Sequence, residues 1–278
     1  MKQKKKQHGV GKTILIVVLV ILLLAGAGYF TYVFFQVETI KVDGNERYDS
    51  SYIEGLANIE PKTHMFFVDT DKIAENIEKE PYIHVKEIAK KYPKTLLVTI
   101  EERQPKAFVV YADKFLLVDQ QGDVLEIADS TQDSVYPIVS GIGIDAVNLG
   151  KQINTDDQFK LAVYTEIITQ LEEKALFELI ATIDLTDINN IKLTSRDGMT
   201  IKFGQSDKVA DKTKWIKKML PKFIKDGRSN GVLDVSSGKD ATYRLNDDAA
   251  VSPVQPPEAT QNPDEPVPSE SAQPDVTE

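Results

Sequence analysis

The longest apolar run in the chain is TILIVVLVILLLAGAGYFTYVFF, residues 13–35, which contains no charged side chain. A helix of this length extends about 34 Å, against roughly 30 Å for the hydrocarbon core of a bilayer. The run therefore predicts a transmembrane helix. The alternative is a secretory signal cleaved after Ala27, because AGA at 25–27 resembles a small-residue cleavage site. We favour an uncut anchor, since aromatic and apolar residues continue from Tyr29 to Phe35, where a cleavage region would turn polar.

The pattern of residues 36–104 predicts a small domain with the order β-α-α-β-β. A strand over residues 37–42 is followed by two short helices, which begin near Ser50 and near Asp69 because these side chains favour helix N-termini. Two further strands follow, and two helices can cover one face of a three-stranded sheet. The last strand alternates cleanly, with inward positions at Leu96, Val98 and Ile100.

Residues 105–248 change to many short strands separated by turns, with two longer amphipathic helices among them. This pattern predicts a mixed β domain whose sheet is mostly antiparallel, so the fold class of the folded part is α+β. The first helix is predicted to place one stripe of side chains in the core: Phe159, Val163, Ile167 and Leu171. The second helix, 207–225, is predicted to bury Val209, Ile216 and Leu220, and to be kinked or ended by Pro221.

Charge is distributed unevenly along the chain. Residues 1–12 carry five lysines and no acid, which predicts a cytoplasmic basic arm and a single-pass type II topology with everything after residue 35 outside. Residues 249–278 are acidic and rich in proline, which predicts a disordered tail. The net charge of −10 argues against nucleic-acid binding. The absence of cysteine excludes disulfides, zinc-thiolate sites and a thiol nucleophile.

Two blocks of sequence resemble a known family. They are FQVETIKVDGN from Phe35 to Asn45 and YPKTLLVTIEERQP from Tyr92 to Pro105, and both resemble the FtsQ/DivIB family of bacterial cell-division proteins, as does FLLVDQQGDVLE further on. The resemblance covers roughly residues 13–245, and the acidic tail is similar to that of the Gram-positive DivIB type. It implies a POTRA domain at 36–104 and a non-enzymatic divisome subunit at the septum. It also implies coiled-coil partners of the FtsL and DivIC/FtsB type, no nucleic acid and no cofactor.

The end of the β domain is the candidate partner-binding site. The last predicted strand, 241–245, is a candidate open sheet edge, which offers unpaired backbone groups to an incoming segment. Tyr243 would supply an aromatic anchor there, although it is equally well interpreted as an ordinary strand residue. The resemblance places the partner contact in the same region, at about 232–245. The candidate contact residues are Val232, Val235, Ser237, Tyr243 and Leu245.

A membrane-anchored enzyme that modifies the cell wall is the alternative function. The only histidines beyond the apolar run are His64 and His84, both in the first domain, so a serine-histidine-acid site is poorly supplied. SSGK at 236–239 matches the S-x-x-K pattern, but it lies in a predicted turn between two strands and lacks the companion motifs. We therefore predict no catalytic, metal or cofactor site.

The second helix of the β domain is strongly basic against an acidic background. Such a patch could meet anionic wall polymer or lipid headgroups, but a solvated helix face is the favoured interpretation. The residues concerned are Lys208, Lys212, Lys214, Lys217, Lys218, Lys222 and Lys225.

Overall fold

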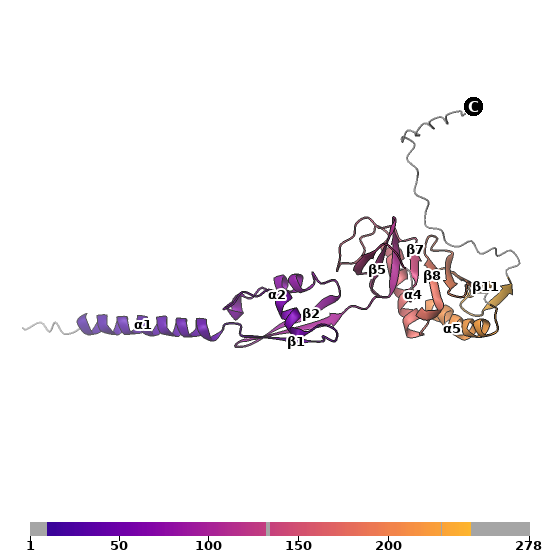
Figure 1. Ribbon diagram of the computed structural model, residues 1–278. Helices are drawn as coiled ribbons and strands as arrows, with labels where there is room; N and C mark the ends of the chain where they lie inside the picture. The colour runs from indigo at the N-terminus through magenta and orange to yellow at the C-terminus, as the bar shows by residue number, and fades with distance from the viewer. Residues whose placement is uncertain (1–9, 132–133, 229, 246–278) are drawn as a thin grey trace, which may run out of the picture.

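The computed structural model describes residues 10–131, 134–228 and 230–245. Most of the predicted basic arm, 1–12, and all of the predicted disordered tail, 249–278, lie outside the described residues. The described part of the chain begins with helix α1, Val10–Phe34, which projects from the folded part (Figure 1). Among the described residues α1 is the one helix that is long and apolar enough to cross a membrane. The predicted apolar helix is therefore confirmed as a helix.

The first domain has the predicted order β-α-α-β-β, with an additional 3₁₀ turn η1 between its two helices. Its three strands lie in the order β1-β3-β2, so the last strand is central; β1 runs parallel to β3 and β2 antiparallel to it. The elements are β1 Thr39–Asp43, α2 Ser50–Ala57, η1 Met65–Phe67, α3 Thr70–Ile77, β2 Ile83–Lys91 and β3 Thr95–Glu102.

Local chemistry explains why this domain folds as predicted. Asp69 accepts a hydrogen bond from the Lys72 N–H and so caps α3. The inward face of β3 is fully buried and packs against the two helices, as alternation predicted. At the end of β3, the Glu102 carboxylate accepts hydrogen bonds from three consecutive backbone N–H groups, those of residues 46–48, at 2.8, 2.8 and 3.1 Å. That carboxylate thereby fixes the loop between β1 and α2.

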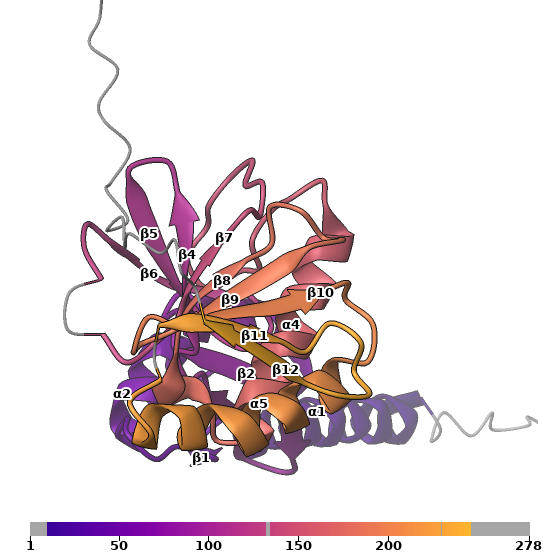
Figure 2. The ribbon, with the colours of Figure 1, turned by 90° about the vertical axis from the view of Figure 1, so that its right-hand side faces the viewer.

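The β domain is built on one nine-stranded sheet with the strand order β12-β11-β10-β9-β8-β7-β4-β5-β6. Figure 2 shows helices α4 and α5 together on one side of this sheet. The strands are β4 Ala107–Tyr111, β5 Lys114–Val118, β6 Val124–Ala128, β7 Ile138–Ser140, β8 Ile180–Asp184, β9 Ile191–Ser195, β10 Thr200–Gly204, β11 Gly231–Asp234 and β12 Thr242–Leu245. The helices are α4 Gln158–Glu173, the 3₁₀ turn η2 Phe177–Leu179 and α5 Val209–Lys225.

The prediction of a mostly antiparallel sheet is confirmed, with parallel pairs confined to three places. These are β4 with β7, β7 with β8, and β10 with β11. Strand β7 was not predicted: it is only three residues long and carries no turn signature of its own. It joins the two halves of the sheet, because β4 and β8 lie on either side of it.

One detail of the predicted helices is wrong, and one is narrowed. Phe159 is 59% exposed instead of buried. Each i,i+4 step turns about 40° around the helix axis, so a stripe of such steps from Leu171 back to Phe159 turns away from the face of α4 that packs in the core. Leu161 and Tyr164 fill the core instead. Of the two effects predicted for Pro221, a kink or the end of the helix, the second does not occur, because α5 continues to Lys225. The Phe223 side chain beyond the proline is buried in the core, and burial of this ring favours the continued helix.

Candidate functional site

Strand β12 is the outermost strand of the large sheet among the described residues, so the predicted sheet edge is confirmed. It pairs antiparallel with β11, with Leu233 opposite Tyr243 and Gly231 opposite Leu245. The strand is only four residues long and its other side meets no strand in the part of the chain that the structure describes. Its outward backbone groups are therefore available for pairing.

Tyr243 lies on the helix side of the sheet and is half-buried there. Its ring stacks on Phe223 of α5 at a centroid distance of 4.5 Å, and its hydroxyl donates to the Arg228 carbonyl at 3.4 Å. Glycine is needed at position 231, because a Cβ there would lie 2.6 Å from the Tyr243 ring and 2.7 Å from the Arg244 carbonyl oxygen. One face of the Tyr243 ring is thus covered by the β domain itself.

The other four candidate contact residues lie in different surroundings. Val235 is fully buried in the core and Val232 is half-buried on the opposite face of the sheet from the helices. Ser237 is an exposed turn residue whose hydroxyl donates to the Asp240 carboxylate at 2.5 Å. Leu245 is 69% exposed, which makes it the large apolar side chain that β12 presents to solvent.

The basic helix is less uniformly exposed than its sequence indicated. Lys212 is fully buried, and its ammonium group donates to the Gln205 carbonyl at 2.7 Å and to the Asp207 carboxylate at 2.8 Å. It also lies 5.1 Å from the centre of the Phe203 ring. Lys212 therefore belongs to the packing of α5 against the sheet, and the other six lysines remain on the surface.

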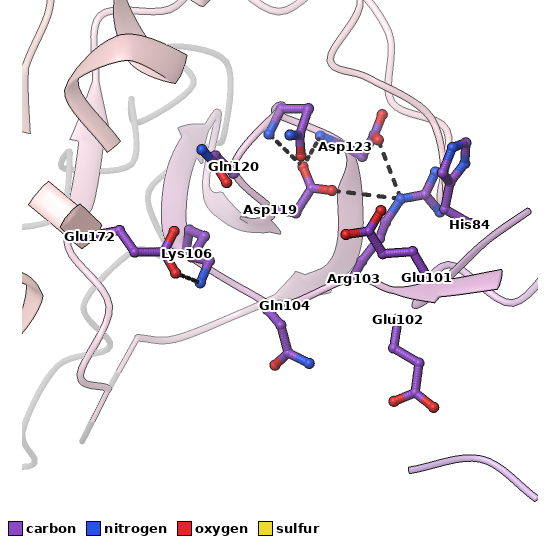
Figure 3. A pocket seen from close by; sticks show the side chains of 11 residues that line it. His84, Glu101, Glu102, Arg103, Gln104, Lys106, Asp119, Gln120, Asp123 and Glu172 are labelled. Atoms are coloured by element: carbon purple, nitrogen blue, oxygen red, sulfur yellow. Dashed lines mark hydrogen bonds and ion pairs between the residues drawn. The ribbon is translucent and has the colours of Figure 1, made fainter. Parts of the chain in front are cut away.

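A polar site that the sequence did not predict lies between the two domains and joins them. Arg103 follows β3 and its side chain is 8% exposed. It donates to the carbonyls of Pro81 at 2.9 Å and Ile83 at 3.0 Å, both in the first domain. On its other side, Nε lies 3.3 Å from the Asp123 carboxylate and 3.6 Å from that of Asp119, both in the β domain (Figure 3). Arg103 thus connects both domains.

The loop between β5 and β6 is folded around Asp119. One carboxylate oxygen accepts hydrogen bonds from the N–H groups of Gln121 and Asp123, at 2.9 and 2.8 Å. The buried Tyr164 hydroxyl donates to the Asp119 carbonyl at 2.6 Å. Burial raises the pKa of the Asp119 carboxyl above its ordinary value, despite these N–H donors and Arg103. Arg103, Asp119 and Asp123 are among the residues that line a cavity of about 420 Å³.

Glu78, at the end of α3, forms a second connection between the domains. Its carboxylate accepts from the Val85 N–H at 3.1 Å and lies 2.9 Å from His84 Nδ1, while Lys151 of the β domain donates to it at 3.3 Å. Partial burial by itself would raise the pKa of Glu78, but these three donors outweigh it and lower that pKa. Gly150 approaches the same helix end, since a Cβ there would lie 2.9 Å from the Glu78 carbonyl oxygen.

Both domains match models of known protein families. Residues 35–103 match the family model of the FtsQ-type POTRA domain, and residues 107–236 match that of the C-terminal part of the cell division protein FtsQ/DivIB. The chain belongs to the FtsQ/DivIB family of cell division proteins. The first domain is accordingly a POTRA domain, as the opening sequence blocks implied.

The chain is similar to individual FtsQ and DivIB proteins. The chain is 28% identical to the cell division protein FtsQ of Syntrophotalea carbinolica over 66% of this chain and 64% of that protein. It is 22% identical to the cell division protein DivIB of Clostridium botulinum (strain Hall) over 85% of this chain and 91% of that protein. A solved structure, the major extracytoplasmic domain of the trans isomer of DivIB from Geobacillus stearothermophilus, matches 41% of this chain and 87% of that one, with 17% identity and a TM-score of 0.30.

The groups considered for catalysis have other contacts in this FtsQ/DivIB chain. The His64 ring stacks on Tyr32 at 5.7 Å and on Phe66 at 5.4 Å, and His84 is paired with Glu78. Residues 236–239 form the turn between β11 and β12, as predicted, and the Ser236 hydroxyl donates to the Asp234 carboxylate at 2.6 Å. Both histidines therefore have structural partners in the POTRA domain.

Proposed function

We propose that this chain is a membrane-anchored scaffold of the division machinery, which binds the outer domains of single-span division proteins and holds them at the septum. Helix α1 is the single membrane span, with the lysine-rich start in the cytoplasm and both folded domains outside. The partners are coiled-coil proteins of the FtsL and DivIC/FtsB type. Membership of the FtsQ/DivIB family supports the division role, and the length and apolar composition of α1 support the anchor.

The open edge at β12 carries the proposal of partner binding. A strand from a partner that pairs with β12 would extend the sheet and satisfy backbone groups that otherwise face water. Leu245 offers an exposed apolar contact beside this edge, and Tyr243 offers the part of its ring that Phe223 leaves uncovered. Val232 and Ser237 flank the same edge, while Val235 supports β11 from the core.

Co-purification of the full chain with the two partner types tests this edge. Leu245→Lys places a charge where an added strand would pack, and Tyr243→Ala removes the aromatic contact; each should weaken co-purification at least tenfold. Ile127→Lys is the matched control, because Ile127 is an exposed apolar residue on β6, the opposite edge strand of the same sheet. Partner binding that is equal in all three variants would refute the edge as the binding site.

Localisation tests the anchor and the septal role separately. A fluorescent fusion of the full chain should form bands at midcell, and depletion of the protein should block division. Protease added to intact cells from which the wall has been removed should digest the folded domains and spare the amino-terminal arm. A soluble product in the medium that begins at Gly28 would refute the anchored topology.

A further inference from the structure

Three aromatic side chains of the POTRA domain are left exposed at the end that adjoins α1. Phe66 and Phe67 lie in η1, and Tyr92 follows β2; they are 56%, 81% and 53% exposed. We refer to these three residues as the aromatic cap. Most exposed apolar side chains of a soluble domain are scattered singly, so three large rings gathered at one end call for an explanation.

The aromatic cap is continuous with the end of α1. Phe35 directly follows the helix, and its ring lies 5.2 Å from that of Phe66 and 6.3 Å from that of Tyr92. The Phe66 and Tyr92 rings are 5.2 Å apart. His64 bridges back to the helix by stacking on Tyr32 at 5.7 Å. The rings therefore form one cluster, which begins on α1 and extends across the near end of the POTRA domain.

The backbone holds this cluster in place. The N–H of Met65 donates to the Phe35 carbonyl at 2.7 Å, and the N–H of Val37 donates to the Thr63 carbonyl at 2.9 Å. Met65 itself is fully buried in the POTRA core. Because Met65 points inward, the two residues after it in the tight 3₁₀ turn are carried on the outside of the domain. The fold thus fixes Phe66 and Phe67 beside the start of the domain.

We propose that the aromatic cap lies in the headgroup layer of the outer leaflet of the membrane that α1 spans, and that it seats the POTRA domain on that surface. This inference rests on the proposed membrane span. Aromatic rings favour the boundary between hydrocarbon and water, and the cap directly adjoins the end of the span. The exposed Lys91, next to Tyr92, adds a positive charge suited to anionic headgroups.

Seating the cap would restrict the tilt of the POTRA domain relative to the membrane. A single span followed by a flexible link would let the domain swing freely, whereas two points of attachment define its direction. In Figure 1 the POTRA domain lies between α1 and the β domain, so its direction also sets where the edge strand β12 stands above the membrane. The cap would therefore help to place the partner-binding edge.

Fluorescence quenching in lipid nanodiscs tests the position of the cap with the full chain. Trp215 is the only tryptophan, so a W215F background permits one tryptophan to be placed at a chosen site. The F67W variant reports on the cap and the F30W variant on the span. The F159W variant is the control, because Phe159 is also an exposed phenylalanine, at 59% against 81% for Phe67, and lies on α4 of the β domain. The nanodiscs contain phosphatidylcholine and phosphatidylglycerol, with a bromine or nitroxide quencher near the headgroups.

The three variants separate this inference from the proposed span. Shallow quenchers should reduce the emission of F67W at least twofold and leave that of F159W unchanged. Quenching of F30W without quenching of F67W would overturn the cap and leave the anchor intact, whereas quenching of neither would overturn both. If F67W is unaffected by lipid and shifts its emission only when partner outer domains are added, the cap is a protein-binding surface and the inference is wrong.

Discussion

Replacement of Arg103 by methionine should destabilise the protein more than any surface substitution. Methionine keeps the apolar stem but removes the guanidinium group, so the carbonyls of Pro81 and Ile83 lose their donor. Asp119 and Asp123 would then face one another without the cation that lies between them and the POTRA domain. The change therefore breaks hydrogen bonds and an ion pair at once.

The geometry sets the size of this effect. Removing one partner of a buried ion pair costs about 3–5 kcal/mol, because the remaining charge loses both water and its counterion. Arg103 and Asp119 are both almost fully buried, which favours a cost within this range. Asp123 is partly exposed, and water can solvate it once Arg103 is gone. We therefore expect a loss of about 3 kcal/mol, at the lower end of that range.

Denaturant unfolding of the full chain in detergent measures this loss, and hydrogen exchange locates it. The amides of Tyr82 and Ile83, and those of residues 119–123, should exchange faster in the Arg103→Met variant, because both segments are held by the same side chain. Arg228→Met is the control, since Arg228 is exposed and should change the free energy of unfolding by less than about 0.5 kcal/mol. A loss below about 1 kcal/mol, or full additivity with Asp119→Asn, would refute Arg103 as the link between the domains.

Three further substitutions follow from the structure. Gly150→Ala should lower the free energy of unfolding, measured with denaturant, by about 1–2 kcal/mol. Gly150 has φ +73°, and the Cβ of alanine there would press on the Glu78 carbonyl oxygen. An unchanged free energy would show that the loop can move away. Burial opposes the ionised form of Glu102, but three backbone N–H donors lower its pKa below the ordinary 4.5. The ionised Glu102 carboxylate therefore stabilises the fold above about pH 4.5, and this stabilisation is lost as the pH falls through the lowered pKa. Glu102→Gln should flatten the decline of stability between about pH 5 and pH 3. A stability profile unchanged from that of the parent chain would contradict this. Pro221→Ala should raise the thermal midpoint, with a gain of about 1–2 kcal/mol, because α5 regains a backbone donor in its interior; a lower midpoint would mean that the proline is needed there.

The periodicity of the sequence predicted most of the architecture. The uncharged run predicted helix α1, and the alternation in β3 predicted Leu96, Val98 and Ile100 as core positions. Both features are local, since they depend only on the spacing of apolar residues along one element. The blocks FQVETIKVDGN and YPKTLLVTIEERQP also indicated the family correctly. Arg103 lies within the second block, yet nothing local to it indicates that its partners are in a different domain.

The places where prediction failed depend on contacts between distant segments. The three-residue β7 is stabilised by β4 and β8 on its two sides, and a sequence that short carries too little periodicity to reveal it. Phe159 lies on a helix that was correctly predicted, but its surroundings depend on how that helix packs on the sheet. Lys212 became a core residue because Asp207 and the Gln205 carbonyl supply the partners that a buried ammonium group requires.

Local sequence patterns were sufficient to predict a long apolar helix, two α+β domains and a strand at 241–245 able to form a sheet edge, because each depends on the order of residues within a single segment. Only the folded structure shows which side chains lie at that edge, how Arg103 and Glu78 join the two domains, and that Phe66, Phe67 and Tyr92 gather beside α1. These arrangements bring together residues that are far apart in the chain, and only the packing of the folded protein specifies such distances.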